Sequence, residues 1–319
     1  MRRTALALMG AAGLALAAVG QATAEPGPVQ PPRSDVVDTA TNHTPSEKLD
    51  AYWTPSRLAH AKPATELAKK AAKSAKAGLA TAPAPSAAAK EPAGKPRRLP
   101  ATTPKNAVGA QASVWGTLGR LVFTVPGKGD YICSANVVTS NNRDVIATAR
   151  HCVMDIDTGQ TYTNFRFAPG YDRGNAPQGW WNWRSMGWRV DDKSPGGDNA
   201  FIVLSTGGNG GGHVQDTVGS SGIGFNQPTN NYAHALGIPG DKDYAVWCEG
   251  MPSDAQQGGV SINPCNGLSG GASGGPFVVN YQSNGEAMQT ASYFGSWGAA
   301  YWAYFRDAAW QVYDGAQKA

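Results

Sequence analysis

The sequence of 319 residues predicts an all-β protein, and three observations carry this prediction. From about Val108 onward, short apolar runs alternate with turn-forming residues, at a spacing typical of a β-sandwich or a β-barrel. Helices do not alternate with these runs, which argues against an α/β fold. A single amphipathic helix is expected, close to the end of the chain.

The first residues have the composition of a secretory signal peptide. Arg2 and Arg3 precede an apolar run that is short for a membrane span, and Ala22, Thr23 and Ala24 form a small-residue cleavage site. We expect residues 1–24 to be removed on export. The mature protein is then secreted and extracellular, with no membrane partner after the signal is removed.

Residues 25–106 are predicted to be a largely disordered propeptide rich in Ala, Lys and Pro. Large apolar residues are few, so this segment alone cannot bury enough surface to offset the entropy of ordering. A transient helix is expected over 64–80, because Ala and Lys favour helix. The basic residues at 95–98 and Lys105 offer sites for proteolytic removal.

Charge is distributed unevenly between this segment and the rest of the chain. Residues 25–106 hold 13 Lys and Arg against 7 Asp and Glu, whereas 107–319 hold 12 against 16. A basic segment can dock on the acidic domain that follows, bind an anionic partner, or serve only as a soluble linker. The chain's own propeptide is one candidate partner, the linker interpretation is at least as well supported, and no nucleic-acid partner is predicted.

Residues 107–319 are expected to form the folded domain. Its predicted strands are 120–125, 131–138, 144–149, 164–169, 199–204, 232–238, 244–249, 259–263, 276–280 and 289–294. The predicted helix is 300–316, where Trp302, Phe305, Ala309, Val312 and Tyr313 share one face. The tryptophan-rich stretch at 179–188 is interpreted as packing residues rather than as a carbohydrate site.

Four cysteines in an exported chain indicate two disulfides. Three pairings are possible, and we expect the sequence-local one, Cys133 with Cys152 and Cys248 with Cys265. A metal site is the competing interpretation, but the wide spacings and the lack of a C-x-x-C motif disfavour it. No metal and no cofactor are predicted.

The stretch GLSGGASGGPFVV, at 267–279, places Ser273 between glycines. It fits the G-x-S-x-G nucleophile elbow of α/β-hydrolases, whose catalytic residues follow the order Ser, Asp or Glu, His. It also fits a G-x-S-G-G-P pattern. Both His213 and His234, like His151, precede Ser273, and no histidine follows it. The α/β-hydrolase order is therefore impossible.

A serine nucleophile needs a general base and an acid that orients the base. His151 is the expected base, because it directly follows an apolar strand and adjoins Cys152. His213 lies in a glycine-rich loop that would position a base poorly, and His234 lies inside a predicted strand.

The acid is expected between the base and the serine. Asp198 is the first choice, because it heads the predicted strand NAFIVL, and Asp192 is the second. Most of the other candidates lie in turns, where Asp commonly bonds its own backbone: Asp155, Asp157, Asp172, Asp191, Asp216, Asp241, Asp243 and Asp254.

The motifs ATARHC, DNAFIVL and GASGGP, in this order, resemble those of chymotrypsin/trypsin-like serine proteases. The similarity is to the secreted bacterial branch, which includes glutamyl endopeptidases and Streptomyces-type enzymes, and covers about 108–316. It implies two six-stranded antiparallel β-barrels with the site between them. It also implies a serine endopeptidase that acts on polypeptides through an acyl-enzyme. A monomer is expected, although no feature of the sequence fixes the oligomeric state.

The resemblance assigns roles to individual residues. Ser273 would attack the peptide carbonyl, His151 would carry the proton and Asp198 would orient the imidazole. The backbone N–H groups of Gly271 and Ser273 would form the oxyanion hole. Two alternatives share the fold: a catalytically silent binding or adhesion module, and an esterase.

Three positions depart from the pattern of well-known relatives. Ala272 replaces the acid that pairs with a new N-terminus in trypsin-like zymogens, and Gly267 replaces the acid behind cleavage after Lys or Arg. No histidine lies in the strand after the serine, where glutamyl enzymes have one. Leu268, Ser292 and Tyr293 are the expected substrate-binding residues, with no preferred side chain assigned.

Overall fold

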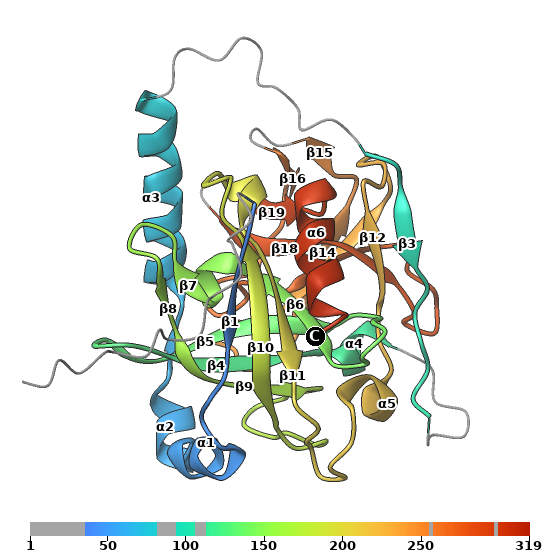
Figure 1. Cartoon of the computed structure of the whole chain (residues 1–319). Helices are drawn as coiled ribbons and strands as arrows, with labels where there is room; N and C mark the ends of the chain where they lie inside the picture. The colour runs from blue at the N-terminus through green and yellow to red at the C-terminus, as the bar shows by residue number, and fades with distance from the viewer. Residues whose placement is uncertain (1–35, 82–93, 106–112, 255–257, 297–298) are drawn as a thin grey trace, which may run out of the picture. The chain divides into compact units, whose positions relative to one another are not determined.

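A computed structural model describes residues 36–81, 94–105, 113–254, 258–296 and 299–319 of the chain (Figure 1). The predicted signal peptide, residues 1–24, lies outside the described residues. Among the helices that the structure describes, none has the length and apolar character needed to cross a membrane.

The first half of the domain is a closed six-stranded antiparallel barrel. Its strands pair in the order β4, β5, β6, β11, β10 and β9, and β9 pairs with β4 to close the ring. The bounds are β4 Leu118–Val125, β5 Gly129–Val137, β6 Val145–Ala149, β9 Thr163–Pro169, β10 Trp181–Arg189 and β11 Asn199–Leu204. Large aromatic side chains fill it, among them Phe123, Phe165 and Trp181, which confirms that the tryptophan-rich stretch contributes to packing.

The second half is a half-barrel built on a nine-stranded sheet. Its main path is β14, β13, β17, β18, β19, β16 and β15, and β12 pairs with β18. The bounds are β12 Gly222–Phe225, β13 Ala233–Gly237, β14 Val246–Gly250, β15 Ser253–Asp254, β16 Gly259–Ile262, β17 Pro276–Val279, β18 Met288–Ser296 and β19 Ala300–Tyr304. The predicted fold class is confirmed.

The helix predicted at 300–316 is wrong in its first part. Residues 300–304 form strand β19, which pairs with β16 and β18, and helix α6 spans only Asp307–Ala316. Trp302 is fully buried against Phe277 and Tyr293, so packing in the second core decides the strand. The helix itself lies on the first barrel, where Tyr313 donates a hydrogen bond to the carbonyl of Thr139 at 2.5 Å.

Short elements complete the domain. They are α4 Val114–Thr117, β7 Met154–Asp155, β8 Gln160–Thr161, α5 Val214–Val218, and the 3₁₀ turns η1 Arg150–Cys152 and η2 Pro195–Gly197. Strands β7 and β8 pair with each other in a separate two-stranded sheet.

The prediction of a largely disordered segment is wrong for residues 36–81. They form β1 Val37–Thr41, α1 Ser46–Tyr52, α2 Pro55–His60, β2 Lys62–Pro63 and α3 Thr65–Thr81, the helix expected at 64–80. Strand β1 pairs with β10, and β2 pairs with β5. This segment needs no core of its own, because its few apolar residues, such as Leu49 and Trp53, are buried against the first barrel.

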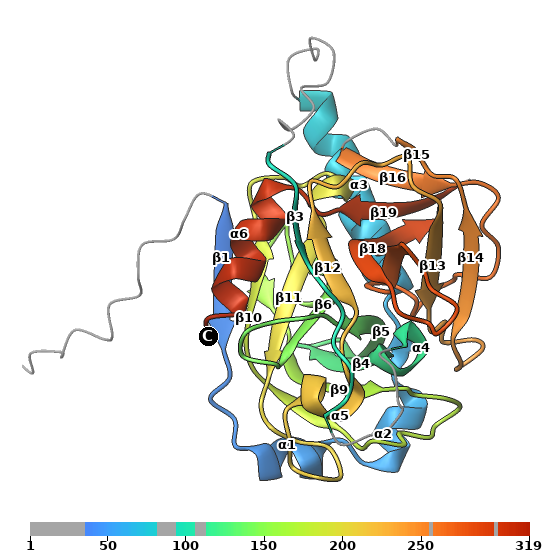
Figure 2. The same ribbon diagram turned by 90° about the vertical axis from the view of Figure 1, so that its right-hand side faces the viewer.

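Residues 94–105 are also ordered, against the same prediction. Strand β3, Arg97–Leu99, adds to the free edge of β12 (Figure 2). Thr102 and Ser220 exchange two backbone hydrogen bonds, and the carbonyl of Pro100 accepts one from Thr139 Oγ1. Arg97 forms an ion pair with Asp307 at 3.0 Å. We call residues 94–105 the strap.

Candidate active site

His151 lies in the turn η1, directly after β6. All five residues of β6 are buried, so the apolar strand fixes the point from which the turn leaves the barrel. The disulfide between Cys133 and Cys152 ties this turn to β5. The imidazole is therefore held on a rigid support and is only 3% exposed.

Asp198 is brought to His151 by strand register. In the antiparallel pair β6 and β11, Ala149 lies opposite Asn199, so the residues that flank this pair meet beyond the strand ends. Asp198 Oδ2 lies 2.7 Å from His151 Nδ1, and Oδ1 accepts a hydrogen bond from the His151 backbone N–H at 2.9 Å. The carboxylate is 1% exposed.

Arg150 supports the pair of His151 and Asp198. A role for it was not predicted from the sequence. Its buried guanidinium donates to the carbonyls of Arg189, Asp192 and Gly197 at 2.8, 2.6 and 2.8 Å. These bonds hold the segment that leads to Asp198, whose Oδ1 lies 4.0 Å from Arg150 Nε. Burial lowers the pKa of Arg150, and the neighbouring carboxylates oppose that effect. Its position beside His151 was the only signal available in the sequence.

Ser273 lies in a tight turn packed against the end of β6. A side chain at Gly274, where φ is +82°, would collide with Thr148 Oγ1 at 2.1 Å and the carbonyl of Ser134 at 2.3 Å. The backbone N–H of Ser134 donates to the carbonyl of Ser273 at 2.7 Å. Since Ser134 adjoins the Cys133–Cys152 disulfide, the serine turn and the histidine turn are fastened to the same point of β5.

Polar atoms of the histidine turn and of the serine turn have no hydrogen-bond partner among the described residues. His151 Nε2 is buried and has no hydrogen-bond partner. In the serine turn, the N–H of Ala272 bonds Ser269 and that of Gly274 bonds Tyr293. The N–H groups of Gly271 and Ser273 have no such bond within the described part of the chain. The arrangement can thus supply a base, a hydroxyl and two donors for a developing oxyanion.

A cavity of about 300 Å³ opens beside Ser273. Leu268 and Tyr293, two of the predicted substrate-binding residues, line it. Ser292 does not: it is fully buried and its hydroxyl oxygen accepts a hydrogen bond from Gln289. The roof of the cavity comes from α3, through Thr65, Ala68 and Lys69. These three residues lie in the segment that the sequence predicted to be disordered.

Helix α3 also covers the other side of the site. Leu67, Lys70 and Ala71 line a small cavity together with His151 and Asp198. Lys70 Nζ donates to Asp155 Oδ2 at 2.5 Å and lies 3.9 Å from Asp157. The helix contacts both η1 and η2 as well as β18. The one helix therefore covers the surroundings of all three predicted triad residues.

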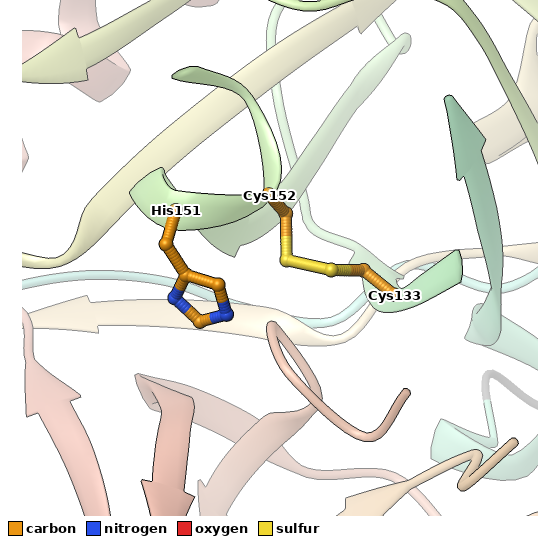
Figure 3. Close-up of side chains that lie close together, drawn as sticks. All are labelled: Cys133, His151 and Cys152. Atoms are coloured by element: carbon orange, nitrogen blue, oxygen red, sulfur yellow. A yellow bond between two sulfur atoms is a disulfide. The ribbon is translucent and has the colours of Figure 1, made fainter. Parts of the chain in front are cut away.

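Cys133, His151 and Cys152 present sulfur and nitrogen atoms within 4.8 Å of one another (Figure 3). The two sulfurs are joined in a disulfide, with an S–S distance of 1.99 Å. They therefore offer no thiolate to a metal ion. The second predicted disulfide, Cys248–Cys265, is also present.

The other candidate bases and the second-choice acid, Asp192, have other partners. His213 Nδ1 pairs with the buried Asp144 at 2.7 Å, and His234 pairs with Glu249 at 2.7 Å. Asp192 does not contact His151; its carbonyl accepts from Arg150 and its carboxylate from the N–H of Ser194. Of the candidates from the sequence, the structure thus pairs His151 with Asp198, and it fastens the turn that holds Ser273 to β5 next to the Cys133–Cys152 disulfide.

Solved structures that are similar to this chain include two proteases from microorganisms. A thermostable serine protease, AL20, from an extremophilic microorganism is 32% identical, with a TM-score of 0.58, over 64% of this chain and 97% of its own. Protease Anisep from Arthrobacter nicotinovorans is 29% identical, with a TM-score of 0.58, over 66% of this chain and 99% of its own.

A more distant likeness concerns the fold alone. A Glu endopeptidase is 15% identical, with a TM-score of 0.51, over 71% of this chain and 99% of its own. No family model and no curated protein matches the sequence.

Proposed function

Because the chain belongs to the chymotrypsin/trypsin-like family of serine proteases, we propose that it is a secreted serine endopeptidase made as a preproprotein. Ser273, His151 and Asp198 are its catalytic triad. The observation that carries this proposal is the buried His151–Asp198 pair, whose free Nε2 belongs to the same rigid assembly as the Ser273 turn.

The proposed chemistry follows from these atoms. Ser273 Oγ attacks the carbonyl carbon of the peptide while its proton passes to His151 Nε2. The carbonyl oxygen becomes an oxyanion between the N–H groups of Gly271 and Ser273. The C–N bond then breaks, and Nε2 returns the proton to the departing amine. A water molecule releases the acyl group by the same steps. Asp198 holds the Nδ1 proton and stabilises the imidazolium.

Secretion is supported by the chemistry of the cysteines. All four are paired in disulfides, which persist in oxidising compartments outside the cell. The bridge at Cys152 also fixes the turn of the general base, so reducing conditions would loosen the site itself.

Residues 36–81 are proposed to be an inhibitory propeptide. Helix α3 covers the approach to Ser273 and His151, and its backbone there is helical rather than extended. A protease of this fold cleaves an extended segment, because the scissile carbonyl must reach both the hydroxyl and the oxyanion donors. The helix can therefore cover the site without being cut there.

The strap is proposed to belong to the enzyme rather than to the inhibitor. It provides β3 to the second sheet, and Leu99 packs against the core cluster that contains Phe225 and Tyr313. None of the strap residues lines either cavity beside the triad. The boundary between inhibitor and enzyme then lies before residue 94, rather than at the 106/107 position expected from composition.

A covalent probe tests the proposed activity. The secreted protein and its Ser273→Ala form are treated with a fluorophosphonate, and the modified peptide is identified by mass spectrometry. Labelling at Ser273 in the processed form supports the proposal. A processed, folded protein without label at Ser273 would indicate a catalytically silent module.

A further inference from the structure

The cavity beside Ser273 has two walls built by the enzyme domain. Residues 268–270 form one wall, and Tyr293, Gly295 and Ser296 at the end of β18 form the other. Its volume of about 300 Å³ corresponds to roughly ten water molecules in the liquid. The roof comes from α3, so removal of the propeptide would open the cavity to a substrate side chain.

Tyr293 is fixed relative to the proposed nucleophile. Its backbone N–H donates to the carbonyl of Gly275, and its own carbonyl accepts from Gly274, at 2.8 Å each. The ring is 2% exposed and packs on Trp302 with a centroid distance of 5.4 Å. Its hydroxyl donates to the carbonyl of Leu268 at 3.4 Å, on the opposite wall. The Tyr293 side chain therefore joins its own wall to the wall of residues 268–270, and it bounds the depth of the cavity.

Within the part of the chain that the structure describes, the enzyme-derived lining carries no formal charge. Among the described residues of the cavity, Lys69 of the propeptide is the one charged side chain. Burial raises the pKa of Tyr293, so its hydroxyl stays neutral. Two opposite charges lie just outside: Asp241 accepts from Ser269 Oγ at 2.6 Å, and Lys242 Nζ donates to the carbonyl of Gly267 at 3.1 Å.

A charged substrate side chain would lose its hydration here without gaining an ionic partner, which is strongly unfavourable. An acid at position 267 could not supply that partner easily, because Gly267 has a φ of +100°. Leu268 and the Tyr293 ring instead present apolar surface to the entering group.

We propose that this cavity is the primary specificity pocket, that it takes a large uncharged, mainly apolar side chain on the acyl side of the cut bond, and that Tyr293 sets its depth. This inference rests on the proposed endopeptidase function and adds the class of residue that is recognised.

The test maps cut sites in a complex peptide mixture with the processed secreted protein, using Ser273→Ala to subtract background. The inference predicts Ser273-dependent cuts after residues such as Leu, Met and Phe. Cuts that depend on Ser273 but follow Lys, Arg, Asp or Glu would overturn the specificity and leave the protease function standing. The absence of Ser273-dependent cuts would overturn the proposed function, and this inference with it.

Two substitutions test the pocket residues. Leu268→Asp places a carboxylate on the wall and should raise cleavage after Lys and Arg, relative to Leu, by at least about 10-fold. The similarly sized neutral variant Leu268→Asn should not do so. Tyr293→Leu should deepen the pocket and raise the ratio of Phe to Leu cuts about 10-fold. Folded variants with an unchanged cut profile would overturn the roles assigned to Leu268 and Tyr293. If a variant does not fold, the cut profile of the unsubstituted enzyme still shows whether the pocket prefers a charged or an uncharged side chain.

Discussion

Asp198 holds His151 at two points: Oδ2 lies 2.7 Å from the ring nitrogen Nδ1, and Oδ1 accepts the backbone N–H at 2.9 Å. Both oxygens are thus engaged by one residue, and the ring cannot rotate without losing a bond. The carboxylate also selects the tautomer with the proton on Nδ1, because it can only accept hydrogen bonds when ionised. Nε2 is then left as the basic nitrogen.

Asp198→Asn should abolish most activity while leaving the fold intact. The amide can donate to Nδ1 and favour the wrong tautomer, which costs on the order of 10⁴-fold in kcat for a triad of this type. Steady-state hydrolysis of a peptide, with circular dichroism as the folding control, measures the effect. A loss of less than about 10-fold in a folded variant would count against the assigned role.

Arg150→Met should destabilise the protein. The substitution removes the Arg150 donor from three carbonyls, two of them in buried hydrogen bonds, and removes a cation 4.0 Å from Asp198. Breaking such a buried network typically costs about 3–5 kcal/mol. Denaturant unfolding of the Ser273→Ala form avoids self-cleavage during the measurement. An unchanged unfolding midpoint would show that the segment before Asp198 holds itself in place.

The triad candidates could be predicted from the sequence because their signals are local. The strand before His151, the cysteine beside it and the glycines around Ser273 are all visible within a few residues. Both disulfides close short loops, with sequence separations of 19 and 17, so this pairing could also be predicted from the sequence.

The features that the sequence did not predict depend on contacts between residues that lie far apart in the chain. Composition shows that residues 36–81 lack a core of their own, but not that Trp53 and Leu49 are buried on the barrel. The period of apolar residues at 300–304 suits a helix, and only the pairing with β16 and β18 makes it a strand. The donors of Arg150 likewise reach carbonyls 39 to 47 residues away.

Leu67→Glu in α3 should release the proposed inhibition. Leu67 is 6% exposed and lines the cavity beside His151, so a carboxylate there disfavours docking of the helix. The full chain should then react with a fluorophosphonate faster, by about 10-fold or more. Lys73→Glu, on the exposed side of the same helix, is the matched control. Equal labelling rates in the two variants and the parent would contradict an inhibitory α3.

The contact between Lys70 and Asp155 should strengthen docking except in strong acid. Burial raises the pKa of Asp155, but hydrogen bonds from Lys70 and from the N–H of Asp157 outweigh it, so the pKa lies below the ordinary 3.8. A lowered folded-state pKa stabilises the folded chain above the unfolded value, and that stabilisation disappears as pH falls through the folded value.

Asp155→Asn measures this contribution in the Ser273→Ala background. Because Lys70 is 41% exposed, the variant should lose only about 0.2–1 kcal/mol of unfolding free energy at pH 7. The difference between parent and variant should shrink as pH falls below about 3.8. A difference that grows in acid would contradict the assigned direction of the pKa.

The central claim is that Ser273 makes this chain an endopeptidase, and a direct comparison of cleavage tests it. The processed secreted protein and an identically prepared Ser273→Ala form are incubated with one defined polypeptide, and new termini are counted by mass spectrometry. We predict internal cuts that fall by several orders of magnitude in the variant. Equal cleavage by the two proteins, or none by a folded and processed parent, would contradict the account.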